Sequence, residues 1–111
     1  MNWIDLSRAD QLTEIKELSR TRPQVIFKHS TRCFISSIVK KRLESDEQPQ
    51  GCDFYFLDLV RHRALSNKIA EEFKVVHESP QVLLIKKEEC IYDESHEGIR
   101  MDEIIEMIGA K

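Results

Sequence analysis

The stretch QVIFKHSTRCFISSIVKKRLE, residues 24–44, runs from a strand pattern through a polar turn into a helix pattern. QVIFK is a short, mostly apolar segment behind Pro23, as expected of a strand that is buried on both faces. Beyond the turn, apolar residues recur at helical offsets and predict a helix that begins near Cys33. That helix would bury Ile35, Ile38, Val39 and Leu43.

The other elements follow from similar patterns along the chain. An S-x-x-D pattern at Ser7 and Asp10 predicts the start of a helix that continues to about residue 21. Because strand and helix patterns alternate, we predict a three-layer α/β/α sandwich on a mixed central sheet with an antiparallel terminal hairpin. The expected elements are strands at 2–5, 52–60, 81–85 and 90–93, a helix through Leu65, Ile69 and Phe73, and a last helix at 101–108 that buries Met101, Ile104, Ile105 and Ile108.

The composition indicates an ordinary small domain. With 111 residues, of which 41% are hydrophobic and 33% charged, the chain fits one compact domain over residues 1–111. A net charge of −3 gives no reason to expect nucleic-acid binding. No signal-peptide pattern and no apolar run of about 18 residues occurs, so we expect a cytoplasmic protein without a membrane partner, and a monomer.

The three cysteines, Cys33, Cys52 and Cys90, follow neither a disulfide pattern nor a metal pattern. They are odd in number and far apart, which suits a reducing compartment. No CxxC pair exists, and the histidines do not lie at metal-ligand spacings from the cysteines. We therefore expect no metal and no bound cofactor. Cys52 begins a strand and Cys90 lies in a hairpin, and we interpret both as structural.

The turn that carries Cys33 is locally positive. No Asp or Glu occurs in residues 23–43, whereas five Lys and Arg residues do. A thiol reacts as its thiolate, which a helix N-terminus and nearby cations stabilise. We expect Arg32 and Lys28 to stabilise the thiolate of Cys33, together with the hydroxyl of Ser36 one helical turn further on. Because Ser36 cannot form a disulfide, exchange at Cys33 would need an external thiol.

The motif KHSTRCFIS, with ESPQVLLI further along the chain, resembles the thioredoxin superfamily and most closely its monothiol bacilliredoxin (YtxJ-like) branch. The resemblance implies a thioredoxin-like fold in which Cys33 is the nucleophile and Pro80 is the cis-proline beside it. It further implies that the backbone of Ser79 docks the substrate and that Thr31 and Phe34 lie against it.

Two positions depart from the pattern of that branch. Arg32 occupies a position that is usually small or polar, and Phe34 replaces the proline that normally follows the cysteine. Phe34 restores a backbone N–H at the first helical position and adds an apolar surface beside the sulfur. We expect reactivity to survive these changes.

The resemblance implies an enzyme, a monothiol oxidoreductase of the CxxS type that removes a low-molecular-weight thiol from mixed disulfides of bacterial proteins. Its partners would be S-thiolated proteins and the thiol itself, with bacillithiol as the expected co-substrate. Bacillithiol carries two carboxylates, which a cationic rim would attract. Glutathione is anionic too, so the charge leaves both thiols open.

Two other functions fit parts of the sequence. A thioredoxin-like module could bind proteins without catalysis, with Cys33 as an incidental thiol. A single-cysteine peroxidase would need a Thr/Ser-x-x-Cys motif with a partner arginine, and STRC matches only part of that arrangement.

Overall fold

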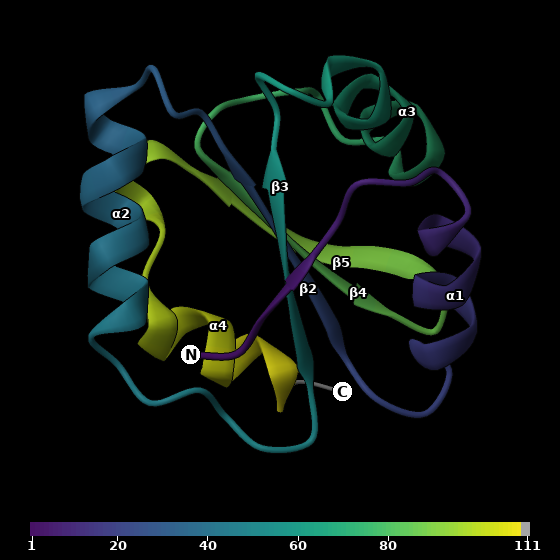
Figure 1. Ribbon diagram of the computed structural model, residues 1–111. Coiled ribbons are helices and arrows are strands. Elements are labelled where there is room, and N and C mark those ends of the chain that lie inside the picture. Colours follow the sequence, from purple (N-terminus) through teal and green to yellow (C-terminus); the bar gives the residue numbers. More distant parts are fainter. Residues whose placement is uncertain (110–111) are drawn as a thin grey trace.

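The computed structural model describes residues 1–109 and contains a five-stranded sheet with helices on both faces (Figure 1). In chain order the elements are β1 (Trp3–Asp5), α1 (Gln11–Leu18), β2 (Gln24–His29), α2 (Phe34–Glu44), β3 (Asp53–Asp58), α3 (Arg63–Phe73), β4 (Gln81–Lys86), β5 (Glu89–Ser95), a 3₁₀ helix η1 (His96–Gly98) and α4 (Met101–Ile108).

The strands lie in the order β1-β3-β2-β4-β5. β1 and β2 each pair in parallel with β3, whereas β4 runs antiparallel to β2 and β5 antiparallel to β4. The crossover helices between the parallel strands and the hairpin at one edge confirm the predicted mixed sheet.

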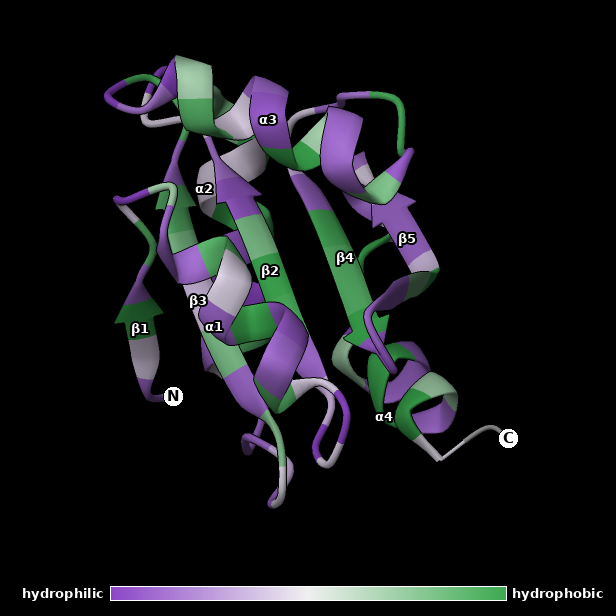
Figure 2. Ribbon diagram, turned by 90° about the vertical axis from the view of Figure 1, so that its right-hand side faces the viewer, coloured by the Kyte–Doolittle hydropathy of each residue, from purple (hydrophilic) through white to green (hydrophobic). Residues whose placement is uncertain are grey.

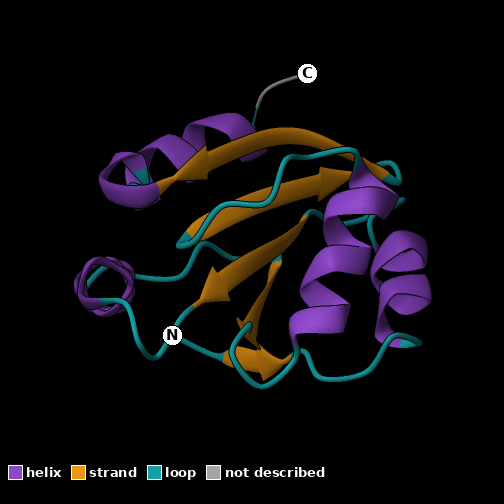
Figure 3. Ribbon diagram, turned by 90° about the horizontal axis from the view of Figure 1, so that it is seen from above, coloured by secondary structure: helices purple, strands orange, loops and turns teal. Residues whose placement is uncertain are grey.

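Two apolar cores fill the space between the sheet and the two helical layers, which Figure 3 shows on opposite sides of the strands. Alternate residues of β2 point to opposite faces, so that Ile26 joins the core under α1 and α3, and Phe27 joins the core under α2 and α4. All six residues of β2 are buried, although Figure 2 shows apolar colour only in the middle of this strand. Trp3 closes the second core, because its ring stacks on the ring of Phe27 with 5.6 Å between the centroids.

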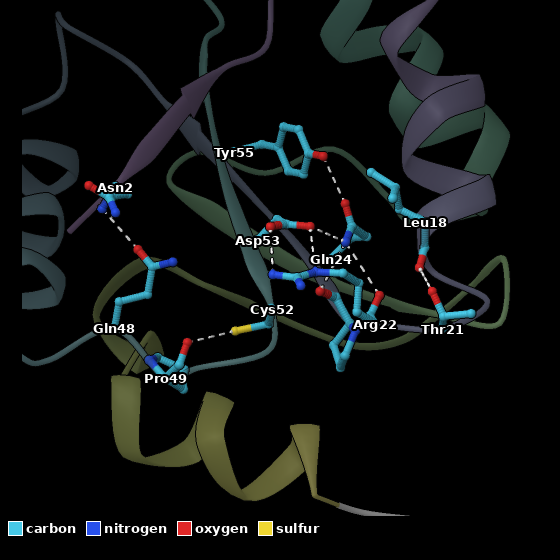
Figure 4. A network of polar contacts seen from close by, with 11 residues as sticks. Asn2, Leu18, Thr21, Arg22, Gln24, Gln48, Pro49, Cys52, Asp53 and Tyr55 are labelled. Carbon is cyan, nitrogen blue, oxygen red and sulfur yellow. Dashed lines mark hydrogen bonds and ion pairs between the residues drawn. The ribbon is translucent and has the colours of Figure 1, made fainter.

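Polar contacts tie together the amino ends of β2 and β3 (Figure 4). The guanidinium of Arg22 donates to both carboxylate oxygens of Asp53, at 3.0 and 2.9 Å. The amide of Gln24 donates to the same carboxylate at 2.7 Å and accepts the hydroxyl of Tyr55 at 2.8 Å. This end of the sheet is therefore held by a satisfied network, and its polar groups have structural roles.

The first helix begins later than the sequence predicts. α1 starts at Gln11, and the expected capping pair of Ser7 and Asp10 does not form. Instead, the side-chain oxygen of Gln11 accepts the backbone N–H groups of Ser7 and Arg8 at 2.8 and 2.9 Å. The N–H of Ser7, which the carboxylate of Asp10 was expected to accept in the capping pair, is thus bound by a glutamine amide instead.

The buried faces of two helices also differ from the predicted ones. In α2, Ile38 is 47% exposed, and the small Ser36 takes the buried position one turn before Val39. In α4, Ile105 is 45% exposed while Ile104 is buried. In each of these helices the fully buried residues form one narrow stripe.

The terminal hairpin is tighter than predicted, because β5 begins at Glu89 and the turn consists of Lys87 and Glu88 alone. Both residues have positive φ, 50° and 69°, as a two-residue turn between twisted strands requires. Among the described residues, no helix is long and apolar enough to cross a membrane.

Candidate active site

Three connections meet at one edge of the sheet, at the top of the molecule in Figure 1. They are the turn from β2 to α2, the turn from β3 to α3, and the loop that leads from α3 into β4. The register explains why they meet: His29 lies beside Asp58 at the ends of two parallel strands, and Lys28 pairs with Gln81 at the start of an antiparallel one. Functional groups commonly gather at such a carboxyl edge.

Cys33 lies in the first of these connections, at the N-cap position of α2. Its backbone is extended, with φ −105° and ψ 118°, and its N–H donates to the carbonyl of Ser30 at 3.1 Å. The side chain is half-buried and carries a free thiol. The first turn of α2 contains no acidic residue and its last turn contains two basic ones, so the positive end of the helix dipole lies at Cys33 with no carboxylate in that turn.

Ser36 is fully buried, and its hydroxyl does not hydrogen-bond the sulfur of Cys33 among the contacts of the described residues. Its Oγ lies 2.7 Å from Nδ1 of His29 and accepts the backbone N–H of Ser30 at 3.1 Å. Burial lowers the pKa of His29, so this imidazole is neutral at pH 7. The expected contact of Ser36 with the thiolate is therefore replaced by one that fixes the turn carrying Cys33.

Lys28, which we expected to stabilise the thiolate of Cys33, lies elsewhere. It faces the layer of α1 and α3, the opposite side of the sheet from α2, and it is fully buried. Its ammonium donates to the backbone carbonyl of Ser66 at 3.1 Å and lies 3.2 Å from Nδ1 of His77. Burial, with a smaller effect of the positive charge of Arg63, lowers the pKa of Lys28 to about 8. Its contacts are with α3 and the following loop, and none is with Cys33.

This burial leads to a prediction about stability. Below about pH 8 Lys28 is protonated in both the folded and the unfolded chain, and folding bears the full cost of burying the charge. Between that pH and the unfolded pKa of 10.5 the unfolded chain binds more protons, so the free energy of unfolding rises with pH. We expect Lys28→Met to raise that free energy at pH 7 by about 2 kcal/mol and to remove the rise.

Urea unfolding at pH 7 and pH 9.5, followed by circular dichroism, measures both effects. Lys41→Met, which replaces an exposed lysine of α2, is the matched control and should change neither. A Lys28→Met protein that is less stable than the parent at pH 7 would contradict the prediction and show that the hydrogen bonds of the ammonium outweigh its desolvation.

The third connection brings Ser79 and Pro80 to the same edge. The peptide bond between them is cis, and Pro80 is buried immediately before β4. The hydroxyl of Ser79 is buried and has no hydrogen-bond partner among the described residues.

The remaining predicted site residues lie on the surface around Cys33. Thr31 and Arg32 are exposed in the turn itself. Phe34, the first residue of α2, is 80% exposed, which is unusual for an aromatic side chain. The turn therefore presents a cation and an apolar ring to a molecule that approaches the sulfur.

The other two thiols are held inside structural contacts. Cys52 is buried at the far end of the sheet, where its thiol donates to the carbonyl of Pro49 at 3.3 Å (Figure 4), and burial raises its pKa. Cys90 donates to the carbonyl of Tyr92, and burial raises its pKa to about 11. Neither lies at a helix N-terminus, so the geometry favours Cys33 as the reactive thiol.

Two histidines of this region were not assigned a role from the sequence. His29 contacts Ser36, and His77 contacts Lys28 and, at 3.3 Å, the hydroxyl of Ser66. The alternation of β2 could have placed His29 on the α2 face, seven residues before Ser36. Among the described residues, no group of three or more His, Cys, Asp or Glu side chains is arranged to hold a metal ion.

Comparison with known proteins gives a family and a fold for this chain. The family model described as monothiol bacilliredoxin BrxC matches residues 4–104. A solved structure assigned as an oxidoreductase with a thioredoxin fold is 28% identical, with a TM-score of 0.81 over 93% of this chain and 90% of that one. Two thioredoxins share the fold at lower identity: that of Malassezia sympodialis (14%, TM-score 0.74, 96% and 88% covered) and thioredoxin f2 of Chlamydomonas reinhardtii (13%, TM-score 0.72, 96% and 94% covered).

These matches confirm the predicted thioredoxin-like fold, and together with the family they support a role in thiol–disulfide exchange. A lone cysteine at the start of α2, followed by a serine one turn later, is the arrangement that the word monothiol describes. Since the family model spans nearly all of the sequence, the chain belongs to the monothiol bacilliredoxin family.

Proposed function

We propose that this protein removes a low-molecular-weight thiol, bacillithiol, from mixed disulfides of other proteins, with Cys33 as the nucleophile. The observation that carries the proposal is the placement of one free, half-buried thiol at the N-terminus of α2, at the sheet edge that also holds a cis-proline, with a serine where a second thiol would resolve it. Membership of the monothiol bacilliredoxin family supports the choice of thiol.

The first step is a thiol–disulfide exchange. The thiolate of Cys33 attacks the sulfur of the small thiol in the mixed disulfide, a new disulfide forms between that sulfur and Cys33, and the old one breaks. The protein thiol leaves as a thiolate and takes up a proton from solvent. One disulfide is consumed and one is formed, so no external oxidant or reductant takes part.

The second step needs another thiol, because Ser36 cannot attack the disulfide on Cys33. A second molecule of the small thiol attacks as its thiolate, a symmetrical small-molecule disulfide forms, and the thiolate of Cys33 is released. The hydroxyl of Ser36 instead holds the turn in place through His29 and Ser30. The cycle therefore passes through a mixed disulfide whose lifetime depends on the concentration of external thiol.

The experiment uses a protein with one cysteine in a bacillithiol mixed disulfide as substrate. Incubation with one equivalent of the purified protein should free the substrate thiol and add one bacillithiol to Cys33, both visible by intact-mass spectrometry with peptide mapping. If the substrate keeps its bacillithiol while the two proteins still associate, the protein-binding module explains the fold better. If neither happens, Cys33 is not a reactive thiol.

A further inference from the structure

A polar cluster that the exchange reaction does not use lies on the face of the sheet opposite α2. It joins Lys28 in β2, Ser66 in α3 and His77 in the α3–β4 loop, which we define as residues 74–80. Lys28 and Ser66 are fully buried. The ammonium of Lys28 lies 3.1 Å from the carbonyl of Ser66 and 3.2 Å from Nδ1 of His77, and the hydroxyl of Ser66 lies 3.3 Å from the same nitrogen. Because an ammonium can only donate, Nδ1 of His77 accepts its hydrogen bond and the ring proton lies on Nε2.

The charges around the cluster favour this hydrogen bond. Burial, with the positive charges of Lys28 and Arg63, lowers the pKa of His77, and the carboxylate of Glu78 opposes the shift only in part. The ring is therefore neutral at pH 7, and its lone pair is free to accept. Lys28, whose pKa is about 8, is mostly protonated at that pH.

Packing alone does not explain an ammonium at this position. Among the described residues, no carboxylate pairs with the buried Lys28. Burying the charge costs free energy, which a methionine of similar length would avoid. Unlike a methionine, the ammonium fastens two other parts of the chain to β2, namely α3 through the carbonyl of Ser66 and the α3–β4 loop through the ring of His77. The contact with the loop is the one that bears on the reaction.

The α3–β4 loop has no regular secondary structure and few other attachments to the rest of the fold. The carbonyl of Val76 accepts the side-chain amide of Gln81 at 3.0 Å. Glu78 lies 3.7 Å from His96, but both side chains are about half exposed, and such a pair adds little stability. The contacts of His77 therefore hold the middle of the loop against β2 and α3.

The end of this loop presents free backbone groups at the reactive edge of the sheet. Among the described residues, the N–H and C=O groups of residues 77–79 make no hydrogen bond. The cis-proline Pro80 follows, and Gln81 after it pairs with Lys28, one residue before the end of β2 and the turn that carries Cys33. An extended polypeptide binds such groups by pairing with them as an added strand. The loop is therefore suited to the protein half of a mixed disulfide, which offers an extended backbone.

A loop with free backbone groups binds a polypeptide well only if it is already held in place, because ordering it on binding costs free energy. We propose that Lys28 is a positioning residue for the protein substrate: through His77 it holds the α3–β4 loop in the conformation that pairs with the polypeptide half of the mixed disulfide. This inference rests on the proposed function, since it concerns the substrate of the same thiol. It goes further by giving the buried lysine a role in substrate binding and by naming the half of the substrate that depends on it.

The test separates substrate binding from thiol reactivity in Lys28→Met. Release of the substrate thiol is measured against the concentration of the bacillithiol-modified protein, with free bacillithiol in excess, and the rate at which iodoacetamide alkylates Cys33 is measured alongside. We expect the substrate concentration that gives half the maximal rate to rise about tenfold. The maximal rate and the alkylation rate should stay within about twofold of the parent, because Lys28 has no contact with Cys33. A purely structural role would not give a protein that is more stable than the parent and yet binds its substrate less well.

Three further variants serve as controls. His77→Asn keeps an oxygen near the position of Nδ1 that accepts from the ammonium, and it should retain most of the substrate binding of the parent. His77→Leu removes the acceptor and should raise the half-saturating concentration as Lys28→Met does. Lys41→Met replaces an exposed lysine of α2 and should change none of these quantities.

Backbone order parameters measured by NMR relaxation report on the loop itself. Residues 76–79 should be more mobile in Lys28→Met than in the parent. An unchanged half-saturating concentration or unchanged order parameters in this variant would overturn the inference, and so would slower alkylation of Cys33, which would show that Lys28 acts on the thiol. The proposed function fails differently, since the parent protein then releases no substrate thiol at any concentration, while the order parameters still decide whether Lys28 holds the loop.

Discussion

Cys33→Ser abolishes both the release of the substrate thiol and the formation of a bacillithiol adduct. The sulfur is the atom that forms and breaks bonds in each step, and a serine hydroxyl is not a nucleophile toward disulfides at neutral pH. Because Cys33 is half-buried at the N-cap and makes only backbone hydrogen bonds there, serine fits the same position. We therefore expect an unchanged thermal unfolding midpoint with no measurable activity.

Cys52→Ser and Cys90→Ser are the matched controls for this result. Both thiols are held in backbone contacts, and burial raises the pKa of each, so neither should take part. Each control should form the adduct at the rate of the parent protein. An adduct that persists in Cys33→Ser and disappears in one of the controls would move the nucleophile to another site.

Ser36→Cys converts the monothiol site into a dithiol site. The new sulfur would lie one helical turn from Cys33, within the range of separations that a disulfide spans. An intramolecular thiol acts at an effective concentration on the order of 1 M or higher, so it should resolve the Cys33 adduct about a thousandfold faster than external thiol at millimolar concentration. We expect the adduct to vanish and the oxidised protein to weigh two hydrogen atoms less than the reduced one.

The matched control is Ser45→Cys, which adds a thiol at the other end of α2 and should leave a stable adduct on Cys33. Ser36→Cys also weakens the contacts to His29 and Ser30, at a cost of about 1 kcal/mol in the free energy of unfolding. Should the adduct on the Ser36→Cys protein last as long as that on the parent, the buried position cannot reach Cys33, and monothiol behaviour would come from geometry as well as from chemistry.

Local sequence patterns were sufficient to predict most of the fold. The run from Gln24 to Glu44 predicts β2, the turn and α2, because burial on both faces and helical periodicity are properties of neighbouring residues. The capping of α1 was predicted wrongly, since the side chain of Gln11 accepts the N–H of Ser7 that Asp10 was expected to bind. The exposed position of Ile38 was also missed, because the width of the packed stripe depends on what lies opposite it.

The sequence by itself determined the place of Cys33 at a strand-to-helix turn, the serine one turn later and the proline before β4, because short-range sterics and helix-end chemistry act within a few residues. Only the tertiary structure decided which groups surround the sulfur. Pairing of β2 with β3 brings Asp58 beside His29 at the edge that carries Cys33, and the packing of α3 on its face of the sheet gives the buried ammonium of Lys28 the carbonyl of Ser66 as an acceptor. Such contacts depend on strand order and on which helix covers which face, and these are settled by burial over the whole chain.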